Sequence, residues 1–190
     1  MRIFIAIELP PQIKQHLGDI TRQLRCSDVT AGWVKPDNLH LTLKFLGDVD
    51  DTRLPRLAEK ISQIARQQNS FTANLNGFGF FPSSKRPRIL YAAIKEPLPF
   101  KQLVQHLDRL LGPSGFAPEQ HFTPHITLAR IKSIKNLERL RQQLDDRILR
   151  QTFTVNAITV FSSTLHADGA QYQVLQRALL AKTIKQPSTS

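Results

Sequence analysis

The clearest alternation of apolar and polar positions lies in NLHLTLKFLGDVD, residues 38–50. Three apolar residues alternate there with three polar ones: Leu41, Leu43 and Phe45 with His40, Thr42 and Lys44. A period of two predicts a β-strand with one apolar face and one polar face. We interpret Lys44 as a solvated charge on the polar face, whereas His40 and Thr42 are candidates for a functional site.

The same pattern returns in HFTPHITLARI, residues 121–131, where His125 and Thr127 share a face. His125 follows His40 by 85 residues (125 − 40 = 85). Two flanking matches keep the same order. RIFIAI at position 2 and RILYAAI at position 88 are 86 residues apart, and FTANL at position 71 and FTVNA at position 153 are 82 apart. Three matches with similar offsets indicate an internal duplication.

Each half predicts the succession strand, helix, histidine strand, helix, strand. The other predicted elements of the first half are Arg2–Glu8, about 11–25, about 51–68 and 71–80. Those of the second half are 88–94, about 100–111, about 134–146 and 153–162, followed by a closing strand at 171–180. Strands interleaved with amphipathic helices predict an α+β fold. We expect a bilobal internal duplication with pseudo-repeats about 2–80 and 88–162. Two mostly antiparallel β-sheets would face a central cleft, with helices outside. We expect residues 1–184 to form this single bilobal domain and residues 185–190 a flexible tail.

The net charge is the feature of the composition that says most about the binding partner. The 26 Lys and Arg residues against 15 Asp and Glu give a net charge of +11, which favours polyanions such as nucleic acid. No apolar run approaches the roughly 20 residues that a membrane span needs. The single cysteine, Cys26, excludes an internal disulfide and suits a cytoplasmic location.

Two imidazoles presented from facing sheets are suited to acid–base chemistry. With an ordinary pKa near 6.5, one can accept a proton while the other donates one. Displacement at phosphorus needs that pairing, because one oxygen attacks while another leaves. A threonine hydroxyl two residues after each histidine can donate to a phosphoryl oxygen as its charge develops. This chemistry requires no metal and no cofactor.

Competing interpretations are weaker. His121 and His125 have the spacing of metal ligands on a helix, but Pro124 disfavours helical geometry in the residue before it. The sequence contains neither GxxxxGK[ST] nor GxGxxG, so the use of nucleoside triphosphates or dinucleotides has no support.

HLTLKFLG and HITLAR, each beginning with His-x-Thr-x, resemble the paired motifs of the two-histidine (2H) phosphoesterase superfamily. RIFIAIELP, WVKPDNLHLTLKFLGDV and FTPHITLAR resemble in particular the RNA 2',3'-cyclic phosphodiesterases, also called 2'-5' RNA ligases. The resemblance covers most of residues 2–180. It implies a bilobal fold with a central cleft and hydrolysis of a terminal 2',3'-cyclic phosphate to a 2'-phosphate.

By the same resemblance, His40 would be the proton donor to the leaving oxygen and His125 the proton acceptor from water. Thr42 and Thr127 would contact the phosphate oxygens. Arg130 matches the arginine of the family pattern HxTxxR. Strict alternation puts its side chain on the opposite face from His125, so it can contribute only if the strand ends or bulges there.

The expected partner is an RNA with a 2',3'-cyclic phosphate terminus, such as a tRNA fragment, bound by a monomer. Two features are candidates for holding this RNA. The first is a set of aromatic residues able to stack on bases, for each of which core packing is the favoured interpretation: Phe45, Phe80, Tyr91 and Tyr172. The second is the basic turn SSKRPR, residues 83–88.

Two alternatives to the RNA phosphodiesterase stay open at this point. A non-catalytic RNA-binding module would use the same basic cleft but would not need two copies of His-x-Thr. A related enzyme acting on a small cyclic nucleotide would need both copies. Within the phosphodiesterase interpretation, ligation stays open as the reverse reaction.

Overall fold

The computed structural model describes residues 1–25, 29–147, 149–166 and 169–182, so Cys26 and the predicted tail at 185–190 lie outside the described residues. The strands are β1 (Arg2–Glu8), β2 (Val29–Trp33), β3 (His40–Asp48), β4 (Phe71–Phe81), β5 (Ile89–Ile94), β6 (His125–Ile134), β7 (Thr152–Val155), β8 (Ala157–His166) and β9 (Gly169–Leu179). The α-helices are α1 (Pro11–Leu24), α2 (Leu54–Gln67), α3 (Leu98–Leu111) and α4 (Leu137–Asp145). Short 3-10 helices occupy Pro36–Asn38, Asp51–Arg53 and Gly112–Ser114.

Most predicted elements are present, and the differences are local. Strand β2 was not predicted. The predicted strand 153–162 is divided at Asn156 into β7 and β8. Helix α4 begins at Leu137, later than predicted, because β6 continues to Ile134 and the Asn136 side chain caps the helix by accepting from the Arg139 amide at 2.9 Å.

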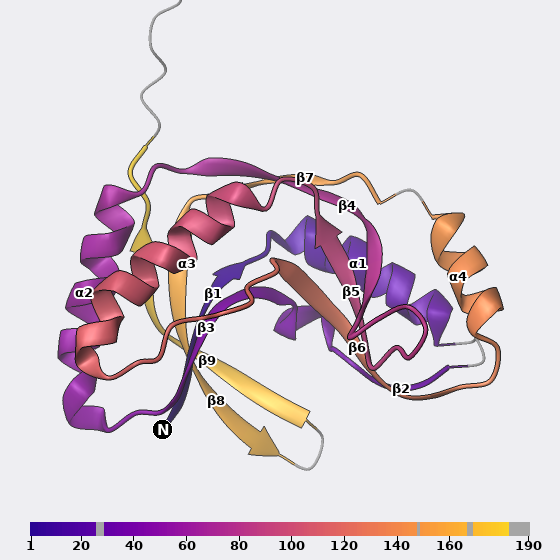
Figure 1. The fold of residues 1–190 in the computed structure, drawn as a ribbon, viewed down its shortest axis with the longest axis horizontal. Coiled ribbons are helices and arrows are strands. Elements are labelled where there is room, and N and C mark those ends of the chain that lie inside the picture. The colour runs from indigo at the N-terminus through magenta and orange to yellow at the C-terminus, as the bar shows by residue number, and fades with distance from the viewer. Residues whose placement is uncertain (26–28, 148, 167–168, 183–190) are drawn as a thin grey trace, which may run out of the picture.

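The strands form a curled sheet in the order β7-β4-β5-β6-β3-β1-β8-β9, with β2 also paired to β6 (Figure 1). The pairs of named strands are antiparallel. The two histidine strands β3 and β6 are neighbours, in register at Leu41 and Ile126. The α+β prediction with mostly antiparallel strands is confirmed. The strands form one continuous sheet, joined at the β3–β6 pair, and not two separate sheets as expected from the sequence.

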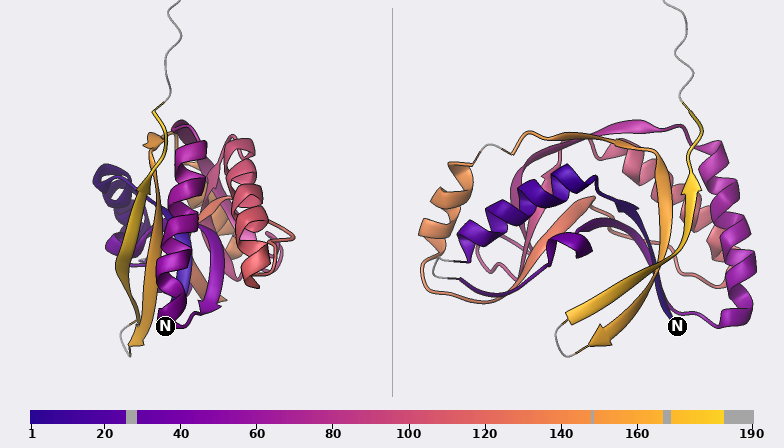
Figure 2. Two further views of the ribbon diagram at one scale, coloured as in Figure 1. Left: turned by 90° about the vertical axis from the view of Figure 1, so that its left-hand side faces the viewer. Right: turned by 180° about the vertical axis from the view of Figure 1, so that it is seen from behind.

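The two halves of the sequence are interleaved in space. Strand β1 pairs with β3 of its own half and with β8 of the other, and β5 pairs with β6 of its own half and with β4 of the other. Helices α2 and α3 lie together at one end of the molecule, against β3, β8 and β9, while α1 and α4 lie at the other end (Figures 1 and 2). Each lobe therefore combines strands from both halves of the chain.

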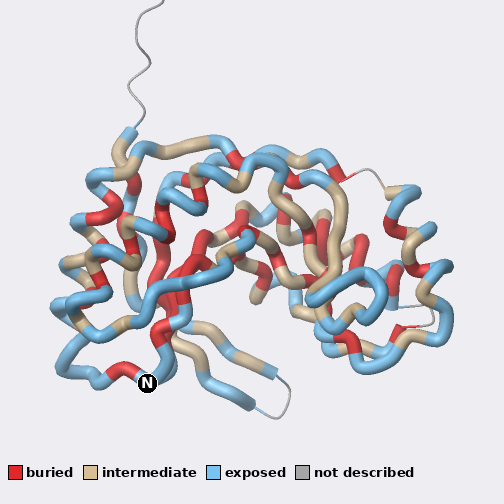
Figure 3. Tube along the Cα trace, viewed as in Figure 1, coloured by how far each residue is buried: buried red, intermediate tan, exposed pale blue. Residues whose placement is uncertain are grey.

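The core follows the centre of the sheet and the inner faces of the helices (Figure 3). Ile3, Ile5 and Ile7 of β1 are buried in the main apolar core. On the opposite face of the same strand, Phe4 packs with Phe161 in a second, smaller apolar cluster. The strand beside His40 is thus packed on both faces, which makes it a rigid support. None of the helices in the described part of the chain is long and apolar enough to cross a membrane.

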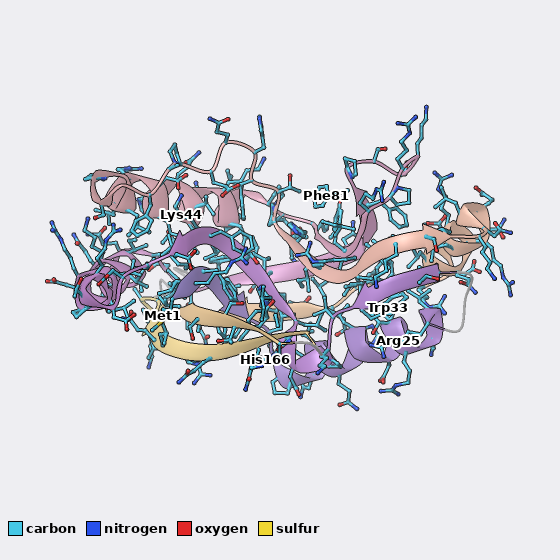
Figure 4. All side chains as sticks on the ribbon, turned by 90° about the horizontal axis from the view of Figure 1, so that it is seen from below. Met1, Arg25, Trp33, Lys44, Phe81 and His166 are labelled. Atoms are coloured by element: carbon cyan, nitrogen blue, oxygen red, sulfur yellow. The ribbon has the colours of Figure 1, made fainter. Side chains whose placement is uncertain are left out.

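The interpretation of Lys44 as a solvated charge is wrong. The pairing of β3 with β1 skips Leu43, a β-bulge that places Leu43 and Lys44 on the same buried side. Lys44, labelled in Figure 4, is only 2% exposed. Its ammonium pairs with the Asp108 carboxylate of α3 and donates to the Ala117 carbonyl. The same bulge turns Phe45 out of the apolar face, where alternation had placed it, and leaves it 65% exposed.

Candidate active site

His40 stands at the first position of β3, directly after the 3-10 turn Pro36–Asn38 and the buried Leu39. Its Nδ1 lies 2.7 Å from the Asn38 carbonyl oxygen. The rings of Phe4 and Tyr172 flank the imidazole, with centroids 4.9 and 5.3 Å away. The ring is therefore held by one hydrogen bond and two aromatic walls.

His125 occupies the equivalent first position of β6. Its Nδ1 lies 2.8 Å from the Thr123 carbonyl oxygen, again two residues upstream. Phe81 and Tyr91 flank this imidazole, at 5.0 and 5.5 Å. Gly79 makes room for the Tyr91 ring, because a Cβ at that position would come within 2.4 Å of it.

The backbone contacts set the tautomer of both imidazoles. A carbonyl oxygen can only accept, so each Nδ1 must carry the hydrogen and donate it. In the neutral ring, Nε2 is then the free acceptor; in the charged ring, Nε2–H is a free donor. Each histidine thus has one nitrogen fixed to the backbone just before its strand and one available for proton transfer.

Both histidines line a single cavity of about 570 Å³. Thr42 and Thr127, which are half-buried, line the same cavity. The five residues singled out in the sequence therefore come together here: His40, Thr42, His125, Thr127 and Arg130.

Arg130 reaches the cavity because β6 departs from strict alternation. Its pairing with β5 skips Leu128, so Leu128 and Ala129 are both buried and Arg130 returns to the face of His125. The sequence analysis expected Arg130 to contribute only if β6 ended or bulged at this point, and the bulge is present. Phe45 in β3 and Arg130 in β6 each follow their histidine by five residues, so equivalent bulges bring both side chains to the cavity lining.

Burial lowers the pKa of His40 to about 4, and the nearby charges of Lys14 and His125 act in the same direction. Burial also lowers the pKa of His125, with Arg130 adding to the effect. The hydrogen bonds to Asn38 and Thr123 oppose these shifts but do not cancel them. Without a ligand, both imidazoles are therefore mostly neutral at pH 7.

Sequence reasoning missed Asn38. Its side-chain nitrogen donates to the Ala170 carbonyl of β9 at 2.7 Å, while its own carbonyl accepts from His40. Asn38 thus connects the β8–β9 hairpin to the histidine. A comparison of the two copies could have singled it out, because it precedes His40 by the same two residues that separate Thr123 from His125.

Arg2 and Tyr172 also line the cavity. Burial raises the pKa of Tyr172, whose hydroxyl therefore stays protonated at neutral pH. Tyr91 stacks on Phe81 at 4.4 Å, and Phe80 packs against the main core, as favoured from the sequence. Over the described ranges, no group of three His, Cys, Asp or Glu side chains is placed to hold a metal ion.

The chain is similar to known proteins along nearly its whole length. The family described as LigT like Phosphoesterase matches residues 7–91 and 94–172. An RNA 2',3'-cyclic phosphodiesterase of Thermotoga maritima is 33% identical over 176 residues, 92% of this chain and 93% of that protein. One of Aquifex aeolicus with the same name is 33% identical over 190 residues, 95% and 97% of the two chains.

Solved structures show the same similarity at the level of the fold. A protein of Thermus thermophilus superposes with a TM-score of 0.77 at 28% identity, covering 95% of this chain and 98% of the other. E. coli LigT in complex with 3'-AMP superposes with a TM-score of 0.75 at 28% identity, over 94% and 97% of the two chains. The sequence match, the fold and the paired His-x-Thr motifs agree, and the chain belongs to the LigT-like, two-histidine phosphoesterase family.

Proposed function

We propose that this protein hydrolyses the 2',3'-cyclic phosphate end of RNA to a 2'-phosphomonoester by acid–base catalysis with His40 and His125. One observation carries the proposal. Two imidazoles, each with Nδ1 fixed to a backbone carbonyl and Nε2 free, line one cavity together with the two threonines. Cyclic phosphodiesterase activity also agrees with the names of the T. maritima and A. aeolicus relatives.

The reaction divides between the two imidazoles. Neutral His125 accepts a proton at Nε2 from a water molecule, whose oxygen attacks phosphorus. As the bond from phosphorus to the 3' oxygen breaks, charged His40 gives its Nε2 proton to that oxygen, and the phosphate stays on the 2' oxygen. Thr42 and Thr127 donate hydrogen bonds to the non-bridging oxygens, and the Arg130 guanidinium offsets their negative charge.

The lowered pKa values make the productive state, with His40 charged and His125 neutral, a minority form of the free protein. A bound phosphate anion favours the charged form of a neighbouring imidazole and so raises both pKa values. The larger shift at His40 would by itself favour the reverse assignment, with His125 as the acid. The family resemblance supports His40 as the acid, and the effect of a better leaving group on each histidine variant separates the two assignments.

Longer RNA is the substrate that the charge favours. The net charge is +11, and the exposed Lys85, Arg86 and Arg88 follow Phe81 in the sequence. Phe81, labelled in Figure 4, lines the cavity. The Arg88 amide donates to the Phe81 carbonyl at 2.7 Å, which ties the basic turn to the site. We propose that the turn contacts the RNA backbone and that tRNA fragments are among the substrates. We further propose that residues 1–184 act as one bilobal unit and as a monomer in the cytoplasm. In 2'-5' ligation, the 5'-hydroxyl of a second RNA would replace water as the nucleophile, and the reverse of that step would cleave the 2'-5' linkage.

The test is incubation of a short RNA ending in a 2',3'-cyclic phosphate with the protein in excess chelator, followed by identification of the phosphomonoester by ³¹P NMR. The proposal predicts a 2'-phosphate and no effect of the chelator. A 3'-phosphate product, or loss of activity that added zinc or magnesium restores, would overturn it. Binding of the RNA without turnover would support the non-catalytic RNA-binding module. Turnover of adenosine 2',3'-cyclic phosphate but not of the RNA would support the small-nucleotide enzyme.

A further inference from the structure

A hollow of about 380 Å³ lies between the start of α2 and the end of α3. We call it the basic hollow, because three cations line it: Arg53, Arg56 and Lys60. Helices α2 and α3 pack together there, at one end of the molecule (Figures 1 and 2). Among the described residues, its lining and that of the catalytic cavity have no member in common. The basic hollow is therefore a separate feature that the proposed reaction does not explain.

The three cations lie on one face of α2. Arg53 directly precedes the helix, and Arg56 and Lys60 follow three and seven residues later. Residues at these spacings are neighbours on a helix surface, where like charges repel and destabilise the helix. The facing wall, from the end of α3 and the segment after it, carries no charge: Leu111, Pro113, Ser114 and Phe116. No carboxylate among the described residues lines the hollow to offset the repulsion.

Two of the three cations are held in place by the facing wall. The Arg53 guanidinium carbon lies 4.8 Å from the centre of the Phe116 ring, and the same group donates to the Ser114 carbonyl. The Lys60 ammonium donates to the Leu110 carbonyl at 2.8 Å and to the Ser114 hydroxyl at 2.7 Å. A guanidinium has five N–H donors and an ammonium has three, so both groups keep donors for a ligand.

Arg56 is the third cation, and it has no hydrogen bond or ion pair with any other described residue. The neighbouring acids Asp50, Asp51 and Glu59 do not line the hollow. The Asp50 carboxylate instead accepts from the Thr52 amide at 2.9 Å. An unpaired arginine is common on a protein surface, but this one shares a hollow with two cations that are already fixed. That arrangement favours an anionic ligand.

We propose that the basic hollow binds a phosphate group. A guanidinium donates two parallel hydrogen bonds to phosphate oxygens, and an ammonium adds a compact positive charge. The bound anion would also relieve the repulsion among the three cations. Two sources carry this chemistry: the backbone of an RNA, which the net charge of +11 attracts, and a free phosphate anion. The inference goes beyond the proposed function and does not depend on it, because binding is measured without turnover.

The RNA source is tested by equilibrium binding. A fluorescein-labelled single-stranded RNA of about 20 nucleotides, ending in a 2'-phosphate, is titrated with the protein at several salt concentrations, and fluorescence anisotropy gives Kd. Arg56→Gln should weaken binding about 5- to 10-fold at low salt, because a charge-assisted hydrogen bond at an exposed site is lost. It should also reduce the slope of log K against log salt by about 0.7, the value for one phosphate contact on a single strand.

Arg66→Gln is the matched control. It removes the same charge from an exposed position ten residues further along α2, about 15 Å away and outside the lining of the hollow. It should change neither the affinity nor the slope. Circular dichroism checks that both variants stay folded, as expected for exposed side chains.

The free-anion source is tested by calorimetric titration with inorganic pyrophosphate. Weaker pyrophosphate binding in Arg56→Gln, with RNA binding unchanged, would identify a free anion as the ligand. Weaker RNA binding in Arg56→Gln, with or without a change for pyrophosphate, would identify the RNA backbone. Unchanged binding of both ligands, or an equal loss in Arg56→Gln and Arg66→Gln, would overturn the site. Hydrolysis enters neither measurement, so a failure of the proposed function would leave this result intact.

Discussion

Replacing Lys44 with methionine tests how the histidine strand β3 is anchored to helix α3. The change keeps a long apolar side chain in place but removes the ammonium that pairs with Asp108 and donates to Ala117. The Lys44 side chain is 1% exposed and that of Asp108 is 16% exposed, so the pair is largely shielded from water. Removing one member of a buried pair typically destabilises a protein by about 3–5 kcal/mol.

The expected loss is at the lower end of this range, about 3 kcal/mol. The Asp108 carboxylate keeps some contact with water and still accepts from the Glu119 amide at 3.0 Å, so it is not wholly uncompensated. For a chain of this size, the loss corresponds to a fall in Tm of roughly 6–12 °C. Asp108→Asn should cost at least as much, because it leaves the more deeply buried partner without a counter-charge.

The assay is urea unfolding, followed by far-UV circular dichroism and by the fluorescence of Trp33, the single tryptophan. Coincident transitions support a two-state analysis. In a double-mutant cycle, Lys44→Met with Asp108→Asn should lose at least about 2 kcal/mol less than the sum of the two single changes, since no unpaired charge remains. Lys95→Met is the matched control, because its pair with Glu96 is exposed and should contribute little. A loss under about 1 kcal/mol for Lys44→Met, or additive single changes, would refute the reasoning.

The remaining predictions concern catalysis. His40→Ala and His125→Ala should each lower kcat by about 10²-fold or more on the RNA substrate while the circular dichroism spectrum is retained, and near wild-type turnover in either variant would contradict the pairing. Thr42→Val and Thr127→Val should lower kcat less than either histidine change, because only a neutral donor is lost; steady-state kinetics on the same RNA measures this. The pH profile of kcat/KM should be a bell with both limbs below about pH 6.5, the ordinary histidine value, since the pKa values of both histidines are lowered in the free protein. The kcat profile should lie at higher pH, because bound phosphate raises both pKa values, and an alkaline limb of kcat/KM above about pH 7.5 would contradict the burial argument.

The duplicated motif made much of the fold predictable from the sequence. Alternation and helical spacing located the first strand and most of the helices, because the apolar face of each element packs into one core. The interleaving of the two halves was not predictable, since the pattern within β1 does not record which strands lie beside it. Strand β2 was missed because it is short, and its few apolar residues do not distinguish a strand from a loop.

The site residues could be predicted where side chains alternate regularly between the two faces of β3 and β6. His40, Thr42, His125 and Thr127 precede the bulges, and strict periodicity placed each of them on the cavity face. Lys44 and Phe45 follow the bulge in β3, so the same rule assigned both to the wrong face. A bulge depends on the partner strand as well as on local sequence, so a single sequence does not reveal its position. The aromatic rings that flank the two histidines come from other strands. They could not be predicted, because a single sequence does not reveal which strands lie beside one another.

The central claim is that one histidine donates a proton to the leaving oxygen while the other accepts a proton from water. The most direct test uses a 2',3'-cyclic substrate in which sulfur replaces the 3' oxygen, because a thiolate leaves without needing a proton. The ratio of kcat/KM for each variant to that of the wild-type protein is measured on the sulfur substrate and on the oxygen substrate. His40→Ala should recover at least about tenfold of its loss on the sulfur substrate, whereas His125→Ala should recover none. Recovery by His125→Ala alone would reverse the roles, and equal recovery or none in both variants would contradict two-histidine acid–base catalysis.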